Sequence, residues 1–236
     1  MLRPHFPPDC EAVTVTRPPL PMRLLRRILV GGHHTIGEHV LIAGNHSGEM
    51  AHWLDGLGFD VEAMDDSRER LATSRRSGVR FEIHFSCLDE ASEFSDEVFD
   101  LIIADELTLH RENLLCLKSR LGTARLLSRL KPGGELVVVR EPGHAMPHDA
   151  TCWTRHLACF PGRLEIIDYP APLLSRETWT WLTGRGRPEH FLTVTLRTPS
   201  ERLSEIEWYQ HAQRGLLTSS APCCSQSQTV SHRRVA

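Results

Sequence analysis

A loop with glycine and small polar residues directly follows the apolar run at residues 39–43. It contains Gly44, Asn45, His46 and Gly48 and leads into a helical pattern. In open α/β sheets, ligands bind at the carboxyl end of the first strand, and glycine lets the backbone approach a ligand closely. We therefore interpret these four residues as the first part of a ligand site.

Carboxylates follow the next apolar runs. Asp65 and Asp66 come directly after the run at residues 60–64. A carboxylate at this point can accept hydrogen bonds from both hydroxyls of a ribose bound across the first loop. Leu88 and Asp89 follow a third run, where an adenine can lie between apolar side chains. This series of residues is typical of a nucleotide-type site.

Short apolar runs alternate with amphipathic segments, and this alternation predicts the elements that must position the site. It is typical of a parallel β-sheet covered by helices. The predicted strands are 39–43, 60–64, 80–85, 99–104, 135–140, 163–168 and 191–196. The predicted helices are 22–30, 47–57, 67–77, 113–130, 148–160 and 200–217. The sequence KPGG at 131–134 predicts a helix stop and a turn.

The ordered set of motifs at residues 39–140 resembles the core of class I S-adenosylmethionine-dependent methyltransferases. Gly44 and Gly48 match the glycine loop of that family, Asp65 matches its ribose-binding acid, and LKPGG at 130–134 matches the turn before its fifth strand. The fourth-strand motif is matched by the sequence that ends in Asp105.

The resemblance implies an α/β, Rossmann-like methyltransferase fold. In that fold a mostly parallel seven-stranded sheet carries helices on both faces and has an antiparallel last strand. The implied cofactor is S-adenosyl-L-methionine. The residues expected to bind it are Gly44, Asn45, His46, Gly48, Asp65, Asp66, Leu88, Asp89 and Asp105.

The same resemblance implies transfer of a methyl group to an oxygen or nitrogen nucleophile of a small molecule or a side chain. Because the nucleophile attacks the methyl group in line, the protein chiefly aligns the reactants, excludes water and supplies a base where needed. Asp105 would orient the donor, and His110 would accept a proton near neutral pH. The alternative is that Asp105 caps the following segment and His110 is a solvated loop histidine.

Two other functions stay open. One is an FtsJ-like RNA ribose 2'-O-methyltransferase, which would share Asp105. The part of the chain after Glu106 has 17 basic and 11 acidic residues, and this excess of positive charge would attract phosphates. However, Arg140 stands where that family uses a lysine, and arginine does not release its proton. A catalytically inactive binding protein is the other alternative, since Ile42 replaces an acid of the family pattern and His46 replaces its middle glycine.

Composition indicates one globular domain with extended ends. The chain has 236 residues, of which 40% are hydrophobic, and a formal net charge of -3. We predict a proline-rich N-terminal arm at 1–22, the methyltransferase domain at 23–217 and a disordered C-terminal tail at 218–236. No apolar run reaches the roughly 18 residues that a membrane span needs, and the N-terminus lacks the features of a secretion signal.

The cysteines and histidines predict neither disulfides nor a metal site. Seven scattered cysteines without a CxxC motif fit a reducing cytoplasm. His148, Cys152 and His156 share a helix face, but among 14 histidines and 7 cysteines such a spacing arises by chance. The oligomeric state does not follow from the sequence.

Overall fold

The structure is a computed structural model, and it describes residues 34–44, 47–76, 83–85, 99–105, 107, 113–140, 150–169, 191–218 and 231–234. The predicted N-terminal arm and the predicted helix at 22–30 lie outside the described residues.

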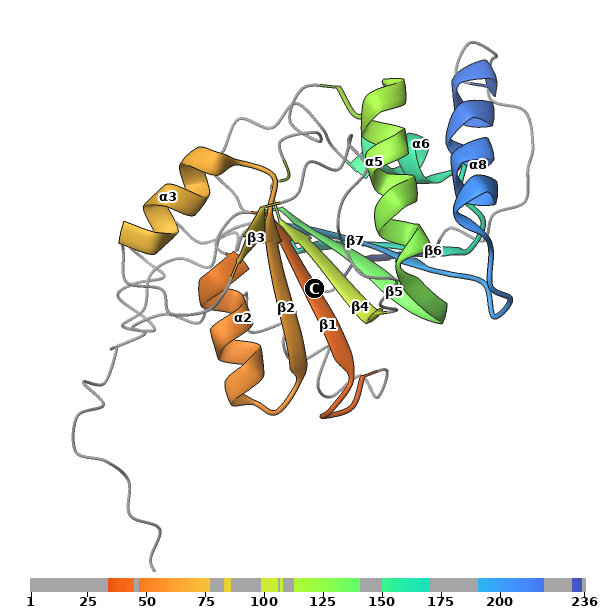
Figure 1. Cartoon of the computed structure of the whole chain (residues 1–236). Helices are drawn as coiled ribbons and strands as arrows, with labels where there is room; N and C mark the ends of the chain where they lie inside the picture. Colours follow the sequence, from red (N-terminus) through yellow and green to blue (C-terminus); the bar gives the residue numbers. More distant parts are fainter. Residues whose placement is uncertain are drawn as a thin grey trace, which may run out of the picture.

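One mixed sheet forms the centre of the described structure (Figure 1). Its strands are β1 (His39–Gly44), β2 (Asp60–Asp65), β3 (His84–Phe85), β4 (Phe99–Asp105), β5 (Leu130–Arg140), β6 (Arg163–Tyr169), β7 (Phe191–Arg197) and β8 (Ser231–Arg234). They lie in the order β3-β2-β1-β4-β5-β7-β6-β8. β7 runs antiparallel to both of its neighbours, and the other pairings are parallel. The fold class predicted from the sequence is confirmed.

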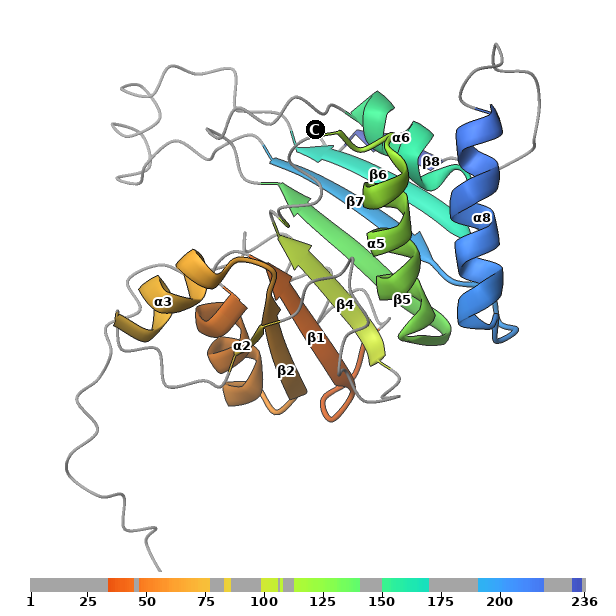
Figure 2. The ribbon, with the colours of Figure 1, turned by 45° about the horizontal axis from the view of Figure 1, so that its top comes forward.

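Helices cover both faces of this sheet. They are α2 (Ser47–Gly56), α3 (Arg68–Arg76), α5 (Leu117–Ser128), α6 (Ala150–Leu157) and α8 (Glu205–Thr218). Met50, Ala51 and Leu54 of α2 pack against apolar residues of β1, β2, β4 and β5 in one core. A second core holds residues of α5, α6 and α8 on the opposite face, where α5 and α8 lie side by side (Figure 2). Burial on both faces explains why β1 and β4 contain uninterrupted apolar runs, at 40–43 and 101–104.

Local side-chain bonds fix where three helices begin. The Ser67 hydroxyl accepts a hydrogen bond from the Arg70 N–H at the start of α3, and the Cys116 sulfur accepts one from the Ser119 N–H at the start of α5. Before α8, Ser204 and Glu207 bond each other's backbone N–H groups. This last arrangement is a capping box, so α8 begins at Glu205 and not at the predicted residue 200.

Two parts of the sheet differ from the sequence prediction. β5 begins at Leu130, which pairs with Phe99, so the KPGG segment belongs to the strand and is not a free turn. The register shifts between Phe99 and Leu101, and Gly133 has a φ of 78°, a conformation that glycine adopts without strain. β8 is an eighth strand, and it lies within the segment that composition predicts to be disordered.

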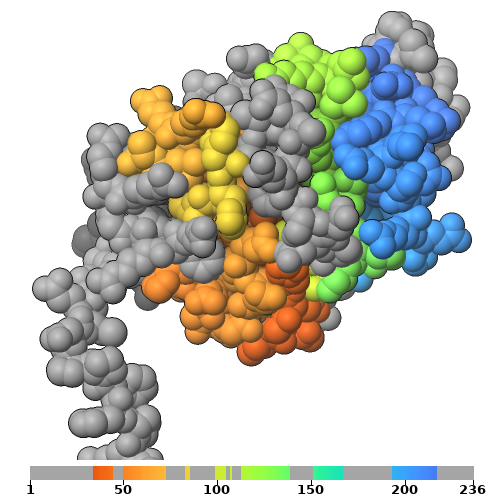
Figure 3. Space-filling view, in the orientation of Figure 1, coloured from red at the N-terminus to blue at the C-terminus, as the bar shows by residue number. Residues whose placement is uncertain are grey.

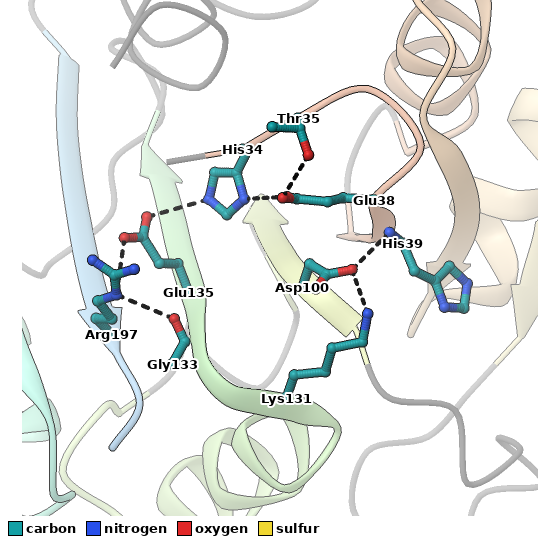
Figure 4. A network of polar contacts seen from close by, with 9 residues as sticks. All are labelled: His34, Thr35, Glu38, His39, Asp100, Lys131, Gly133, Glu135 and Arg197. Atoms are coloured by element: carbon teal, nitrogen blue, oxygen red, sulfur yellow. Dashed lines mark hydrogen bonds and ion pairs between the residues drawn. The ribbon is translucent and has the colours of Figure 1, made fainter. Parts of the chain in front are cut away.

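A polar network joins the segment before β1 to the amino ends of β4 and β5 (Figure 4). The carboxylate of Asp100 accepts hydrogen bonds from the His39 N–H at 2.9 Å and from the Lys131 ammonium group at 2.6 Å. His34 lies between Glu38 and Glu135, with its ring nitrogens 2.8 and 3.4 Å from their carboxylates. The network ties together elements that are far apart in the sequence, at the edge where the parallel strands begin.

Candidate functional site

The opposite edge of the sheet brings together three residues predicted for the site. Ala43 of β1 pairs with Met64 of β2. The next residue in each strand, Gly44 and Asp65 respectively, is the last of that strand. Gly44 pairs in register with Asp105 at the end of β4. The strand order also reverses here, because β1 is followed by β2 on one side and has β4 on the other. Such a reversal opens a crevice at the carboxyl ends of the strands, where α/β proteins bind ligands.

Gly44 turns the chain from β1 toward α2. Its φ is 110°, in the region that side chains with a Cβ rarely adopt. Gly48 lies in the first turn of α2. Besides the close approach to a ligand that the sequence predicts, glycine at position 44 therefore has a direct reason in the backbone conformation.

Asp65 is a buried carboxylate at this edge, with 2% of the residue exposed. Its Oδ1 accepts a hydrogen bond from the Ser67 N–H at 2.8 Å. The Arg70 guanidinium donates through Nη2 to Oδ1 at 2.7 Å and through Nε to both oxygens at 3.1 Å. Nη2 of Arg70 also donates to Asp66 at 2.6 Å. One arginine from α3 therefore holds both the acid that ends β2 and the acid that follows it.

Burial and charge act against each other at this carboxylate. Burial is the larger effect and raises the pKa of Asp65, while the hydrogen bonds and charge of Arg70 and the Ser67 N–H lower it. The pKa of Arg70 lies above its usual value, since the attraction of Asp65 and Asp66 outweighs its own partial burial. Arg70 therefore offsets part of the effect of burial on the pKa of Asp65.

The surface beside this pair is formed by α3 and β3. The two elements are neighbours in the space-filling view (Figure 3). The guanidinium carbon of Arg68 lies 4.7 Å from the ring centroid of Phe85, a cation–π contact between α3 and β3. Both residues are exposed, so the contact contributes little to stability, and it does not involve Asp65 or Asp66.

Ile42 stands at one position where this chain differs from the methyltransferase family that its motifs resemble. Ile42 lies in the middle of β1, is fully buried and packs in the core beneath α2. It therefore contributes apolar packing where the family pattern has a carboxylate.

The other predicted site residues are described less fully. For Asp105 the structure describes the backbone, at the end of β4. Asn45, His46, Leu88, Asp89 and His110 lie outside the described residues. Sequence reasoning missed Arg70, although its spacing of four residues from Asp66 on a helix pattern is a signal for an ion pair.

His156 has a structural environment rather than that of a metal ligand. It is fully buried; its Nδ1 donates to the Leu114 carbonyl and its Nε2 lies 2.8 Å from the Thr123 hydroxyl. His148 lies outside the described residues. In the described part of the chain, no three His, Cys, Asp or Glu side chains gather as metal ligands. Among the helices in those same ranges, none has the length and apolar character needed to cross a bilayer.

Comparison with known proteins gives similarity at the level of fold. No protein-family model matches the chain, and neither does any curated protein. One similar crystal structure is the N-methyltransferase NodS from Bradyrhizobium japonicum WM9, with 18% identity, 75% of this chain and 93% of that chain covered, and a TM-score of 0.48.

Two further crystal structures are similar to the same degree. A TehB-like S-adenosylmethionine-dependent methyltransferase from Corynebacterium glutamicum shares 18% identity over 72% of this chain and 84% of that chain, with a TM-score of 0.49. A magnesium protoporphyrin IX methyltransferase from Synechocystis PCC 6803, crystallised with its bound methyl donor, shares 14% identity over 75% and 76%, with a TM-score of 0.47. At these identities the likeness is one of fold alone.

Proposed function

We propose that this chain is a methyltransferase that uses S-adenosyl-L-methionine and methylates an oxygen or nitrogen nucleophile of a small molecule or a side chain. The observation that carries the proposal is the alignment of Asp65, Gly44 and Asp105 at the carboxyl edge of the sheet, where the strand order reverses.

The described residues fit the nucleoside part of this cofactor. Asp65 offers a buried carboxylate at the end of β2, which is the group needed to accept ribose hydroxyls. Gly44, with its positive φ and no side chain, lets the backbone of the following loop approach the ligand. We assign Asn45, His46, Gly48, Asp66, Leu88 and Asp89 to the same site from their places in the sequence.

The protein's part in the reaction is alignment and proton transfer. The bound cofactor would supply a methyl group made electrophilic by its sulfonium. Asp105, next to Gly44 in the sheet, orients the donor side of the site. His110, five residues further along the chain, accepts the proton that the oxygen or nitrogen loses as its bond to carbon forms. For this displacement the bound cofactor would give up its carbon–sulfur bond and would leave as a neutral thioether.

Methyl transfer from donor labelled with tritium in the methyl group tests this proposal. The purified chain is incubated with a metabolite extract, a protein fraction or capped RNA, and each pool is counted. We expect label in metabolites or protein, and His110→Ala should lower the turnover by about 10²–10⁴-fold. His52→Ala, which changes an exposed histidine of α2, should leave the turnover within about twofold.

Three results would contradict the proposal. Salt-sensitive labelling of RNA alone would assign the chain to ribose methylation. Donor binding without label in any pool would indicate an inactive binding protein. Full turnover by His110→Ala would remove His110 from the reaction.

A further inference from the structure

We propose that Arg70 is a positioning residue for the cofactor: it holds one oxygen of Asp65 and leaves the other for a ribose hydroxyl. This inference rests on the proposed function, and it assigns a role to a residue that the sequence motifs do not include.

The two oxygens of Asp65 are used unequally. Oδ1 accepts hydrogen bonds from the Ser67 N–H, from Nη2 of Arg70 and from Nε of Arg70. Within the described part of the chain, Oδ2 accepts only the Nε bond, at 3.1 Å, which it shares with Oδ1. A carboxylate oxygen has room for about two good hydrogen bonds. Oδ1 is therefore saturated by the protein, while Oδ2 keeps an acceptor site for a ligand.

Contacts with α3 and with both acids hold the Arg70 side chain in position. Its backbone N–H bonds the Ser67 hydroxyl, and its Nη2 also donates to Asp66, so the guanidinium is held by both acids and by the first turn of α3. Its side chain is 18% exposed. An arginine so enclosed presents a fixed fork of donors, which a flexible ammonium group does not.

Charge gives Arg70 a second effect on Asp65. Among the described residues, the charged groups that act on the Asp65 carboxylate are Arg70 from α3 and Asp66, which follows β2. In the sheet, β3 pairs the uncharged Phe85 with Asp65, and β1 ends in Gly44, which has no side chain. Beyond Gly44, β4 contributes the acid Asp105. Arg70 is thus the positive group that lowers the pKa of this buried carboxylate, against burial and against Asp66.

The matched pair of variants is Arg70→Gln and Arg68→Gln. Both remove one positive charge from the first turns of α3, but Arg68 contacts Phe85 rather than the acids. Calorimetry with S-adenosylhomocysteine should give a Kd about 10–30-fold higher for Arg70→Gln and within about twofold of wild type for Arg68→Gln. Arg70→Lys should lie between them, because lysine restores the charge and not the fork.

The pH dependence separates positioning from a general loss of folding. Asp65 in Arg70→Gln should take up a proton at a higher pH than in the wild type, because the charge and hydrogen bonds of Arg70 lower its pKa. Binding of S-adenosylhomocysteine should be lost at a correspondingly higher pH as the solution is acidified. Carbon-13 NMR of the Asp65 carboxyl group measures this protonation without any cofactor, and circular dichroism verifies the fold of each variant.

Failure of this inference differs from failure of the proposed function. If the wild type does not bind S-adenosylhomocysteine, the proposed function is wrong, and the inference with it, whatever NMR shows. If the wild type binds while Arg70→Gln and Arg68→Gln bind equally well, or if the protonation of Asp65 is unchanged in Arg70→Gln, Arg70 does not position the carboxylate.

Discussion

His34 and Glu135 lie 101 positions apart in the chain, yet Nε2 of His34 is 3.4 Å from the Glu135 carboxylate. The other ring nitrogen lies 2.8 Å from Glu38. A histidine between two carboxylates is favoured in its charged form, since both ring nitrogens then donate. The contact fastens the segment before β1 to β5, at the edge of the sheet opposite to the candidate site (Figure 4).

This contact predicts a stability that depends on pH. Burial acts to lower the pKa of His34, but hydrogen bonds and charges from Glu135 and Glu38 outweigh it, so the pKa is raised. The stabilisation by the charged ring is therefore complete below the unfolded pKa of about 6.5 and is lost as the pH rises through the higher folded pKa. At about pH 6, His34→Gln should lower the free energy of unfolding by about 1–3 kcal/mol.

Urea unfolding of wild type and His34→Gln at several pH values measures this effect. The difference between the two proteins should shrink as the pH rises, and other titrating groups cancel in the difference. His52→Gln, at an exposed position of α2, should show a difference near zero at every pH. A His34→Gln difference that stays constant or grows with pH would show that the ring is not charged in the folded state.

Gly44 and Gly37 allow backbone strain to be separated from ligand binding. Both have positive φ, 110° and 90°, so alanine at either position should cost about 1–3 kcal/mol of stability. A Cβ at Gly37 would meet no atom within 4 Å, and Gly37 lies before β1. We expect Gly44→Ala to weaken S-adenosylhomocysteine binding by at least about tenfold and Gly37→Ala by less than about twofold. Equal losses of affinity would mean that Gly44 acts through stability alone.

The buried pair Thr123 and His156 should contribute to folding and not to the site. Because Nδ1 of His156 donates to the Leu114 carbonyl, its Nε2 accepts from the Thr123 hydroxyl at 2.8 Å. Thr123→Val keeps the shape but removes that donor, so the free energy of unfolding should fall by about 1–3 kcal/mol.

Thermal unfolding with Thr151→Val as the control measures this contribution. Thr151 is an exposed threonine of α6, and its substitution should leave the melting temperature nearly unchanged. If Thr123→Val is as stable as the wild type, the buried hydrogen bond makes no net contribution to the free energy of unfolding.

The fold could be predicted from the sequence where one physical signal dominates. The continuously apolar runs of β1 and β4 specify strands buried on both faces, and the structure places them at the centre of the sheet. The start of β5 at Leu130 could not be predicted, because proline and glycine, as in the KPGG segment at 131–134, normally end an element. In the structure, pairing of Leu130 with Phe99 and a register shift keep this segment in the sheet. β8 has a polar composition, and its strand form comes from pairing with β6, which local sequence does not encode.

The candidate site could be predicted in part. Gly44, Asp65 and Asp105 follow apolar runs, so their convergence at one sheet edge follows from parallel strand geometry. Arg70 lies in a highly charged helix, where charge is expected to face solvent, and only the fold shows that it turns toward Asp65. The sequence gives the charge of a side chain and its position along the chain, but tertiary packing decides which residue it contacts.

Calorimetric titration of S-adenosylhomocysteine into wild type and Asp65→Asn tests the central claim most directly. The amide has nearly the same size as the carboxylate but donates hydrogen bonds with its nitrogen and carries no charge, so it does not accept ribose hydroxyls equally well. We predict a single site in the wild type and a Kd at least about 30-fold higher in Asp65→Asn. No binding by the wild type at millimolar ligand, or equal binding by both proteins, would contradict the account.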